Sequence, residues 1–372
     1  MIFIKGVHYR LKKKTKKENL ILGIVAITFS QIIVKILGLV YKMYLTNHEG
    51  FGDAGNAIYG SGFQIYTILL TISSIGVPSA IAKLISAKLA IGDNRGAHRI
   101  FKVCFVIFSL IGIGGSTLLF VGAGFISKTL LQIPEAELTL VTLSPSVFFV
   151  TISSVIKGYF NGRGELKATA KSQTFEQIFK TIFTVAIVEI TSKLFLNKTY
   201  IMAAGANLAT TIATFFGMSY LFLYYKLKSK EIWQDVNLSE QHRLAKAKTI
   251  IRQILMLSVP ITFTALLGAL TKNIDAITVV RGLKNIMTEA EAKTQYGILT
   301  GKIDTLVMFP LSLNIALSIA IVPKISSLNA RRKLESINNK ISYAILLTEL
   351  ISIPSTVRHV CICKTNLRIT FS

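Results

Sequence analysis

The stretch IFKVCFVIFSLIGIGGSTLLFVGAGFI, residues Ile100 to Ile126, contains one charged residue, Lys102, and otherwise only apolar and small residues. A helix must present about 20 mostly apolar residues to cross the hydrocarbon core of a bilayer, and this stretch is longer. Apolar runs of such length are typical of membrane spans rather than of soluble domains. The stretch therefore predicts a transmembrane helix in an integral membrane protein.

Seven other stretches of similar character indicate further spans. They run roughly from Leu20 to Leu45, Ile58 to Leu84, Leu138 to Phe160, Ser172 to Thr191, Ile201 to Tyr225, Ile251 to Val280 and Ile298 to Val322. A ninth begins at Ile341 and breaks off near Val357, which makes it marginal in length for spanning. We therefore expect an all-α integral membrane protein with about eight complete transmembrane helices and the start of a ninth.

The composition of the 372-residue chain agrees, with 51% apolar residues, 16% charged residues and a mean hydropathy of +0.56. Soluble domains carry about 25% charged residues. The formal net charge is +24. Such a balance would suit a nucleic-acid-binding protein, but the apolar runs are too long for one, so nucleic acid is not an expected partner. In a membrane protein the basic residues report topology instead.

The Lys and Arg residues alternate between the loops in a way that orients the chain. With segment 1–19 placed in the cytoplasm, the predicted inside segments hold 28 of these residues and the outside loops hold six. Because cytoplasmic loops carry the excess of positive charge, we expect a cytoplasmic N-terminus in a bacterial cell membrane. Segment 1–19 has no small-residue cleavage site, so we do not expect a removed signal peptide.

The charge distribution also suggests a domain organisation. We expect a basic cytoplasmic N-terminus at 1–19, an N-terminal six-helix lobe at 20–226, a cytoplasmic inter-lobe loop at 227–249, an incomplete C-terminal lobe at 250–357 and an aberrant tail at 358–372. The loop is rich in charge and holds the only tryptophan, Trp233. It is interpreted as a link between lobes, and its charge equally fits an amphipathic stretch on the anionic inner leaflet.

Ionisable residues inside the spans are the first candidates for function, because each costs about 2.5 to 3.5 kcal/mol on insertion scales. Gln31, Lys35 and Lys42 share one face of the first span, where two amines can bind an anion. For Lys42, snorkelling to the interface is the alternative. In the fifth span, Glu176 precedes Lys180 by four residues, which favours either a helix-packing salt bridge or a cavity wall.

The seventh and eighth spans carry two further lysine and aspartate pairs. Lys272 and Asp275 are three residues apart in the seventh span, and Lys302 and Asp304 lie in the eighth. They can pair within one helix or across the two helices. Asp275 is the best candidate for a coupling-ion or proton site, Asp304 is a second candidate, and self-neutralising packing is the other interpretation.

The spans lack the motifs of a membrane enzyme, namely HExxH, GxSxG and a Walker lysine, so we do not expect catalysis. A Cys361-x-Cys363 pair is weak evidence for a metal site, and no metal or cofactor is expected. The span interiors are cationic by residue count, with five lysines against Glu176, Glu189, Asp275 and Asp304. Lysines in a water-filled cleft suit a phosphate or pyrophosphate.

Several strings resemble the oligosaccharide flippase branch of the MOP transporter superfamily, with the stage V sporulation protein B group the most similar. They occur in family order to about Ser355 and include KILGLVYKMYLTN (35–47), IYGSGFQIYTILLTISSIGVPSAIAKLIS (58–86), GYFNGRGELKATAKSQTFEQIFK (158–180) and NIDAITVVRGL (273–283). The resemblance implies a MATE-like bundle of two helical lobes around a central cavity, with alternating access. It also implies translocation of a polyprenyl-pyrophosphate-linked oligosaccharide or peptidoglycan precursor. Membrane lipids and cell-wall synthesis enzymes are the other partners that it implies.

The resemblance assigns roles residue by residue. By position, Lys35 and Lys42 match the basic pair of the family's first helix. Arg163 matches the arginine of the family's GRG loop, which implies a gating role. Glu176 matches the glutamate after its SQ string, and Asp275 matches the acid of its NxID string. Lys302-Ile303-Asp304 departs from the family pattern and predicts an ion pair near the cavity. The resemblance stops at SIPSTV, residues 352–357, for which a frameshift or a truncated reading is the expected explanation.

Three functions remain open at this point. The first is lipid-linked glycan translocation, which requires a cationic cavity. The second is a cation-coupled, MATE-like drug or metabolite exporter, for which Asp275 is the one good acidic candidate. The third is an inactive flippase fragment or a membrane scaffold of a cell-wall assembly complex, in which the buried charges only fix the packing and Lys35 is dispensable.

Overall fold

A computed structural model gives the structure of the protein and describes residues 26–27, 29–195, 198–239, 244–304, 307 and 334–361. Within those ranges all regular secondary structure is helical. This confirms the predicted all-α fold class. The predicted eighth span, Ile298 to Val322, lies largely outside the described residues.

The helices follow the predicted spans and extend beyond them. They are the first helix (Phe29–Asn47), α2 (Gly52–Thr71), α3 (Val77–Ala90), α4 (Asn94–Phe125), α5 (Glu137–Gly162), α6 (Leu166–Leu194), α7 (Thr199–Asn237), α8 (Ala247–Leu283), α9 (Glu289–Ile298) and α11 (Leu334–Cys361). A π-helical turn, η1 (Ile72–Gly76), joins α2 to α3, and another, η4 (Leu299–Ile303), follows α9. In the part of the chain that the structure describes, six helices are long and apolar enough to cross a membrane.

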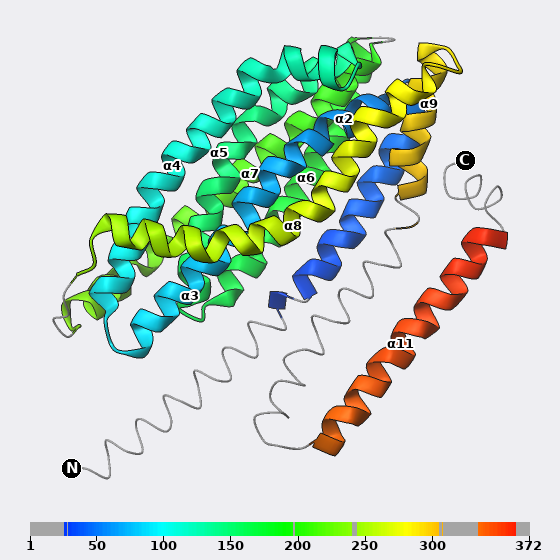
Figure 1. Cartoon of the computed structure of the whole chain (residues 1–372). Coiled ribbons are helices and arrows are strands. Elements are labelled where there is room, and N and C mark those ends of the chain that lie inside the picture. The colour runs from blue at the N-terminus through cyan, green and yellow to red at the C-terminus, as the bar shows by residue number, and fades with distance from the viewer. Residues whose placement is uncertain are drawn as a thin grey trace.

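The centre of the bundle is α5, which packs against α2, α3, α4 and α7, while α6 lies along α7 (Figure 1). Small residues make this central position possible. A Cβ atom at Gly158 or Gly162 would come within 2.9 or 2.8 Å of Ile81 or Ile85 of α3. Their spacing of four residues places both glycines on one face, so the backbones of α3 and α5 approach closely there.

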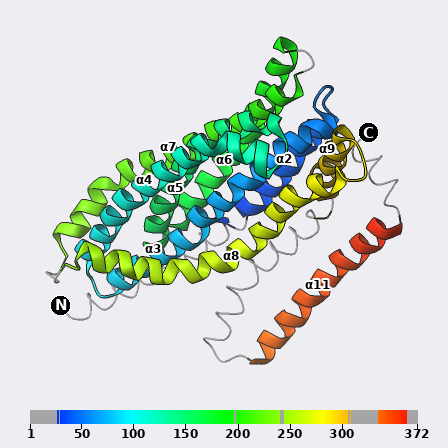
Figure 2. The same ribbon diagram turned by 45° about the horizontal axis from the view of Figure 1, so that its top comes forward.

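The α8 helix crosses the bundle beside α2 and α3, and Figure 2 shows it lying along one side. It contacts α2, η1, α3 and α9. Gly76 allows one of these contacts, because a Cβ there would come within 2.0 Å of the Thr262 hydroxyl oxygen. Helix α8 thereby brings Lys272 near residues of the first helix and α2.

Two sequence boundaries differ from expectation. The predicted inter-lobe loop, 227–249, is helical at both ends, because α7 continues to Asn237 and α8 begins at Ala247. The predicted ninth helix begins before Ile341 and continues past Val357, since α11 spans Leu334–Cys361. Intrahelical hydrogen bonds carry a helix into polar sequence beyond the apolar run, so hydropathy underestimates its length. Both views show α11 apart from the bundle (Figures 1 and 2).

Candidate functional site

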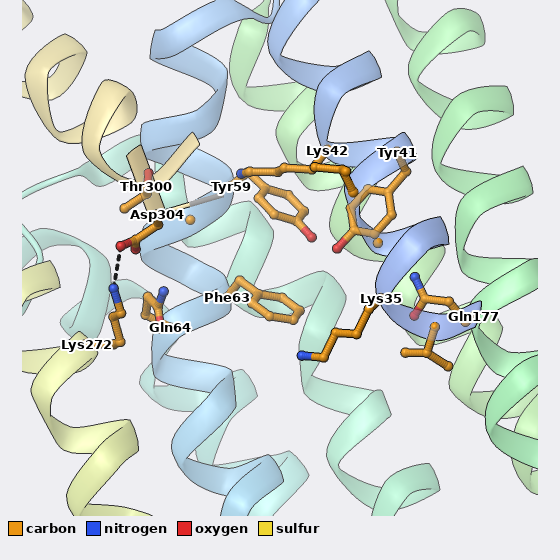
Figure 3. Close-up of a pocket in the computed structure, with 14 residues that line it drawn as sticks. Lys35, Tyr41, Lys42, Tyr59, Phe63, Gln64, Gln177, Lys272, Thr300 and Asp304 are labelled. Atoms are coloured by element: carbon orange, nitrogen blue, oxygen red, sulfur yellow. Dashed lines mark hydrogen bonds and ion pairs between the residues drawn. The ribbon is translucent and has the colours of Figure 1, made fainter. Parts of the chain in front are cut away.

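A cavity of about 400 Å³ lies between the first helix, α2, α6, α8 and η4 (Figure 3). Lys35, Tyr41 and Lys42 of the first helix form one side of it. Its other polar and aromatic lining residues are Tyr59, Phe63, Gln64, Gln177, Lys272, Thr300 and Asp304. These residues come from distant parts of the sequence, so tertiary packing assembles the cavity.

The aromatic wall of the cavity follows from helical spacing. Tyr59 and Phe63 are four residues apart on α2, and their rings stack at 5.7 Å between centroids. Gly60 lies beside them and faces Thr300, whose hydroxyl oxygen would be 3.1 Å from a Cβ at that position. The glycine therefore lets η4 close against α2 at the cavity wall.

Lys42 is held inside the bundle. Its ammonium donates a hydrogen bond of 2.8 Å to Asn56 Oδ1 and lies over the Tyr59 ring, 4.9 Å from the centroid. Asn56 in turn donates through Nδ2 to the Thr46 hydroxyl, which donates to the Lys42 carbonyl. This closed set of bonds gives the Lys42 ammonium partners within the protein, and snorkelling stays the untested alternative.

Lys35 lines the same cavity, but its ammonium is not anchored as that of Lys42 is. Its side chain points into the open space below Phe63 (Figure 3). Among the described residues it has neither a hydrogen-bond nor an ion-pair partner. The two lysines share one helix face as predicted, yet one amine is anchored and the other is available to a ligand.

Lys180 is 8% exposed and lies against two aromatic rings, 4.5 Å from the Phe63 centroid and 5.1 Å from that of Tyr41. The salt bridge between Glu176 and Lys180, one of the two alternatives for this pair, is therefore not formed. Glu176 instead lies 3.8 Å from the ammonium of Lys157 on α5. The aromatic faces offer Lys180 a cation–π contact in the direction of the cavity, whereas Glu176 faces a neighbouring helix.

Gln31 and Glu176 line a second, smaller cavity of about 220 Å³. Gln31 donates a hydrogen bond of 3.0 Å to Gln173, which ties the first helix to α6. Val34 and Gln177 line both cavities, so the two adjoin. Gln173, Glu176 and Gln177 of α6 therefore extend the polar lining beyond the main cavity, whereas Lys180 lines neither cavity.

The charged residues after α9 pair with other helices. Lys302 contacts Asp53 of α2 at 2.8 Å, and Asp304 accepts a hydrogen bond from Lys272 of α8 (Figure 3). A local Lys302–Asp304 pair and a Lys272–Asp275 pair are therefore both wrong, and the cross-helix alternative is confirmed. Residues two apart in a helix point to different sides, which sends Lys302 and Asp304 to different partners.

Two candidates lie outside the cavities. Asp275 is half-buried on α8 and does not line either cavity. Arg163 follows the end of α5 and donates to Asp235 of α7 at 2.9 Å and to Glu165 at 3.3 Å. It joins the ends of two helices and lines neither cavity.

Sequence reasoning missed the aromatic and polar groups that hold the lysines. Tyr41, Tyr59 and Phe63 appear as ordinary apolar helix residues, although the spacing of Tyr59 and Phe63 already places them on one face. Asn56 and Asp53 fell in a predicted external loop, but α2 begins at Gly52 and brings both into the bundle. The position of Asn56 and Asp53 just before an apolar run is the sequence feature that could have indicated their place in the bundle.

The bundle matches transporters of known structure. The inward-facing structure of a multidrug resistance MATE family transporter of the MOP superfamily aligns with a TM-score of 0.70 over 94% of this chain and 75% of that one, at 12% identity. The chain therefore has the fold of this transporter, and with its long apolar helices it is a multi-pass membrane protein. Residues 20–329 match the family described as polysaccharide biosynthesis protein, and the chain belongs to that family.

Two curated relatives are similar over most of this chain. Stage V sporulation protein B of Bacillus subtilis (strain 168) is 26% identical over 339 residues, covering 89% of this chain and 62% of that protein. The lipid II flippase MurJ of the same organism is 25% identical over 349 residues, covering 91% of this chain and 64% of the flippase. The chain thus spans slightly less than two thirds of each relative.

Proposed function

We propose that the chain acts in a flippase, not an enzyme, and that it binds a polyprenyl-pyrophosphate-linked glycan for transfer from the inner to the outer leaflet of the bacterial cell membrane. The observation that carries this proposal is the charge of the main cavity. Lys272 is neutralised by Asp304, whereas Lys35 and Lys42 have no carboxylate partner among the described residues. The available ammonium of Lys35, with the anchored ammonium of Lys42 on the same helix face, favours a pyrophosphate, whose oxygens accept hydrogen bonds from lysine.

The lipid chemistry of the proposed substrate fits the way the bundle is built. A pyrophosphate and its sugar are too polar to enter the hydrocarbon core alone, whereas a polyprenyl tail is stable there. A cavity inside the helices shelters the head group while the tail stays in the bilayer. One relative carries the name lipid II flippase, which supports this substrate class.

Closure at one end of the bundle supports alternating access. Near α9, Lys293 lies 2.9 Å from Glu135 of the turn before α5, and Lys302 lies 2.8 Å from Asp53. Gly297 packs so tightly on α2 that a Cβ there would overlap the Asp53 carbonyl oxygen. We propose that these contacts close the external end and that they separate when the head group is released.

The exporter alternative has less support from the described residues. A cation-coupled exporter needs an acidic group free to bind Na⁺ or H⁺ in the cavity. The acidic residue that lines the cavity, Asp304, is paired with Lys272. Asp275 remains a candidate coupling site, but it does not line the main cavity.

The test is complementation of a flippase-deficient strain by the full-length protein carrying Lys35→Gln. We expect loss of growth with unchanged membrane abundance, because the substitution removes the available cation without removing a packing contact. Lys193→Gln, at an exposed position of α6, is the matched control and should complement normally. Normal growth of the Lys35→Gln strain would contradict the anion-binding role and favour the scaffold.

Native mass spectrometry of the purified chain separates binding from transport. We expect a retained polyprenyl-pyrophosphate adduct that is lost in Lys35→Gln and kept in Lys193→Gln. Retention of the adduct in both variants would place the pyrophosphate elsewhere in the protein.

A further inference from the structure

A third cavity, of about 440 Å³, lies at the end of the bundle where α3 meets α4 and α7 leads to α8. Figure 1 shows this end opposite the one that carries α9. The cavity shares no lining residue with the two cavities described above. It therefore needs its own explanation.

Basic residues dominate its wall. Arg95, Arg99 and Lys102 line it from one face of α4, at spacings of four and three residues. No carboxylate is found among the lining residues that the structure describes. The acids nearby are already engaged, since Asp93 pairs with Lys88 at 2.9 Å and Asp235 pairs with Arg163. The three cations thus face the cavity uncompensated.

His98 supplies a second, independent indication of a ligand. It lines the cavity and is only 4% exposed, yet both of its ring nitrogens lack a hydrogen-bond partner within the described ranges. A buried polar atom without a protein partner is unfavourable, so such a group calls for a water, a ligand or an ion beside it. The ring stands edge-on to Trp233, at 5.1 Å between centroids.

Two contacts organise the site before any ligand arrives. Arg99 donates through Nε to the Ala245 carbonyl at 2.8 Å, which holds its guanidinium and leaves its terminal N–H groups available. The ammonium of Lys102 lies over the Trp233 ring, 5.1 Å from the centroid. The basic groups are therefore partly fixed in position around the buried imidazole.

The surface next to the cavity is apolar. Along the same face of α4, Val106 is 59% exposed and Leu110 is 66% exposed. Both continue the spacing of Arg99 and Lys102 toward the middle of the span. Such a strip suits the acyl chains of a lipid whose head group enters the cavity.

We propose that this cavity binds the phosphate group of an anionic membrane lipid, with the acyl chains along the Val106–Leu110 strip of α4. Arg95, Arg99 and Lys102 hold the phosphate oxygens, and His98 supplies a further hydrogen bond from its ring. The predicted topology places this end in the cytoplasm, so the lipid comes from the inner leaflet.

Trp233 is the sole tryptophan of the chain and lines the cavity, so its fluorescence reports binding directly. The full chain in detergent is titrated with short-chain phosphatidic acid, with short-chain phosphatidylcholine and with inorganic phosphate. We expect a saturable change with phosphatidic acid at much lower concentration than with the other two probes. The paired substitution Arg95→Gln and Arg99→Gln should weaken that binding about tenfold or more.

The matched control is the paired substitution Lys83→Gln and Lys230→Gln, which removes the same charge from exposed positions near this end outside the cavity and should leave the affinity unchanged. His98→Phe keeps the aromatic packing and removes the ring nitrogens, so it should also weaken binding. If inorganic phosphate binds with the same affinity as phosphatidic acid, the ligand of the cavity is free phosphate and not a lipid. No saturable change, or the same midpoint in the arginine variant and the control, would overturn the site.

Discussion

At the scale of single residues, the two lysines of the first helix show how neighbours divide the roles of identical side chains. Lys42 is fixed by Asn56 and the Tyr59 ring, whereas Lys35 projects into the cavity. Asn56 is fully buried and satisfies Lys42 and Thr46 at once. The amide is therefore a structural support for a charge inside the membrane.

Replacing Asn56 by alanine should destabilise the protein. The substitution leaves a buried ammonium without its acceptor, which costs about 1 to 3 kcal/mol. We expect a lower melting temperature of the purified protein in Asn56→Ala. Asn285→Ala, at an exposed position after α8, is the control and should melt like the parent. Equal melting of the two variants would show that the hydrogen bond to Lys42 contributes nothing to stability.

At the scale of elements, glycines decide which helices come close. Gly158 and Gly162 of α5 face Ile81 and Ile85 of α3 at distances that leave no room for a methyl group. Gly268 of α8 has nothing within 4 Å of its Cβ position. The same residue type is thus essential at one helix surface and unneeded at another.

These glycines allow a paired test. Gly158→Ala should destabilise the bundle by about 1 to 3 kcal/mol, because the added methyl overpacks the contact with α3. Gly268→Ala should be neutral or should stabilise by about 0.5 to 1 kcal/mol, because alanine favours the helix. Thermal unfolding of both variants in the same detergent checks this. A stable Gly158→Ala protein would argue against the close approach of α3 and α5.

The start of α9 is joined to the bundle by exposed charges. Glu289 pairs with Lys293 at 2.9 Å and with Lys284 at 3.2 Å, and Lys293 also contacts Glu135. The hydrogen bond from Lys293, followed by that from Lys284, lowers the pKa of the Glu289 carboxyl. The lowered pKa means that the pairing favours the folded state while this carboxyl is ionised.

The pH dependence of this junction follows from that direction. A carboxyl whose folded pKa is depressed contributes stability above its unfolded value of about 4.3, and loses it as the pH falls through the folded value. Glu289→Gln should therefore melt slightly below the parent at pH 7, and the difference should shrink as the pH falls through the folded pKa of Glu289. We expect a small difference, since the group is exposed. A difference that persists in acid would rule out the ionic origin.

At the scale of the whole molecule, orientation in the membrane is the property on which both proposals depend. The loops between α3 and α4 and between α7 and α8 lie at one end of the bundle, and α9 lies at the other (Figures 1 and 2). The excess of Lys and Arg predicts that the first end is cytoplasmic. With that orientation, we expect the cavity lined by Arg95, Arg99 and Lys102 to face the cytoplasm and the contacts around α9 to face outward.

Cysteine labelling tests this orientation. With Cys361 and Cys363 replaced by serine, Asn47→Cys and Asn285→Cys should react with an impermeant reagent in intact cells. Lys230→Cys should react only after permeabilisation. Ser61, near the start of the second predicted span, is fully buried, so it is unsuitable as a labelling position. The reverse pattern of labelling would invert the topology.

The sequence alone determined the class of protein and the location of most helices. Long apolar runs and helical spacing are local properties, so they predicted the spans and placed Lys35 and Lys42 on one face. They also predicted a charge-rich interior. The division into two lobes and the substrate remain predictions, because neither follows from periodicity.

The partners of the buried charges were decided only by the tertiary structure. Sequence proximity suggested the pairs Glu176–Lys180 and Lys302–Asp304, but each residue found a different neighbour on another helix. A charge in a low-dielectric interior is stabilised by whichever group the packing brings within reach, and helices far apart in sequence supply that group. The anchored state of Lys42 and the free state of Lys35 arise in the same way.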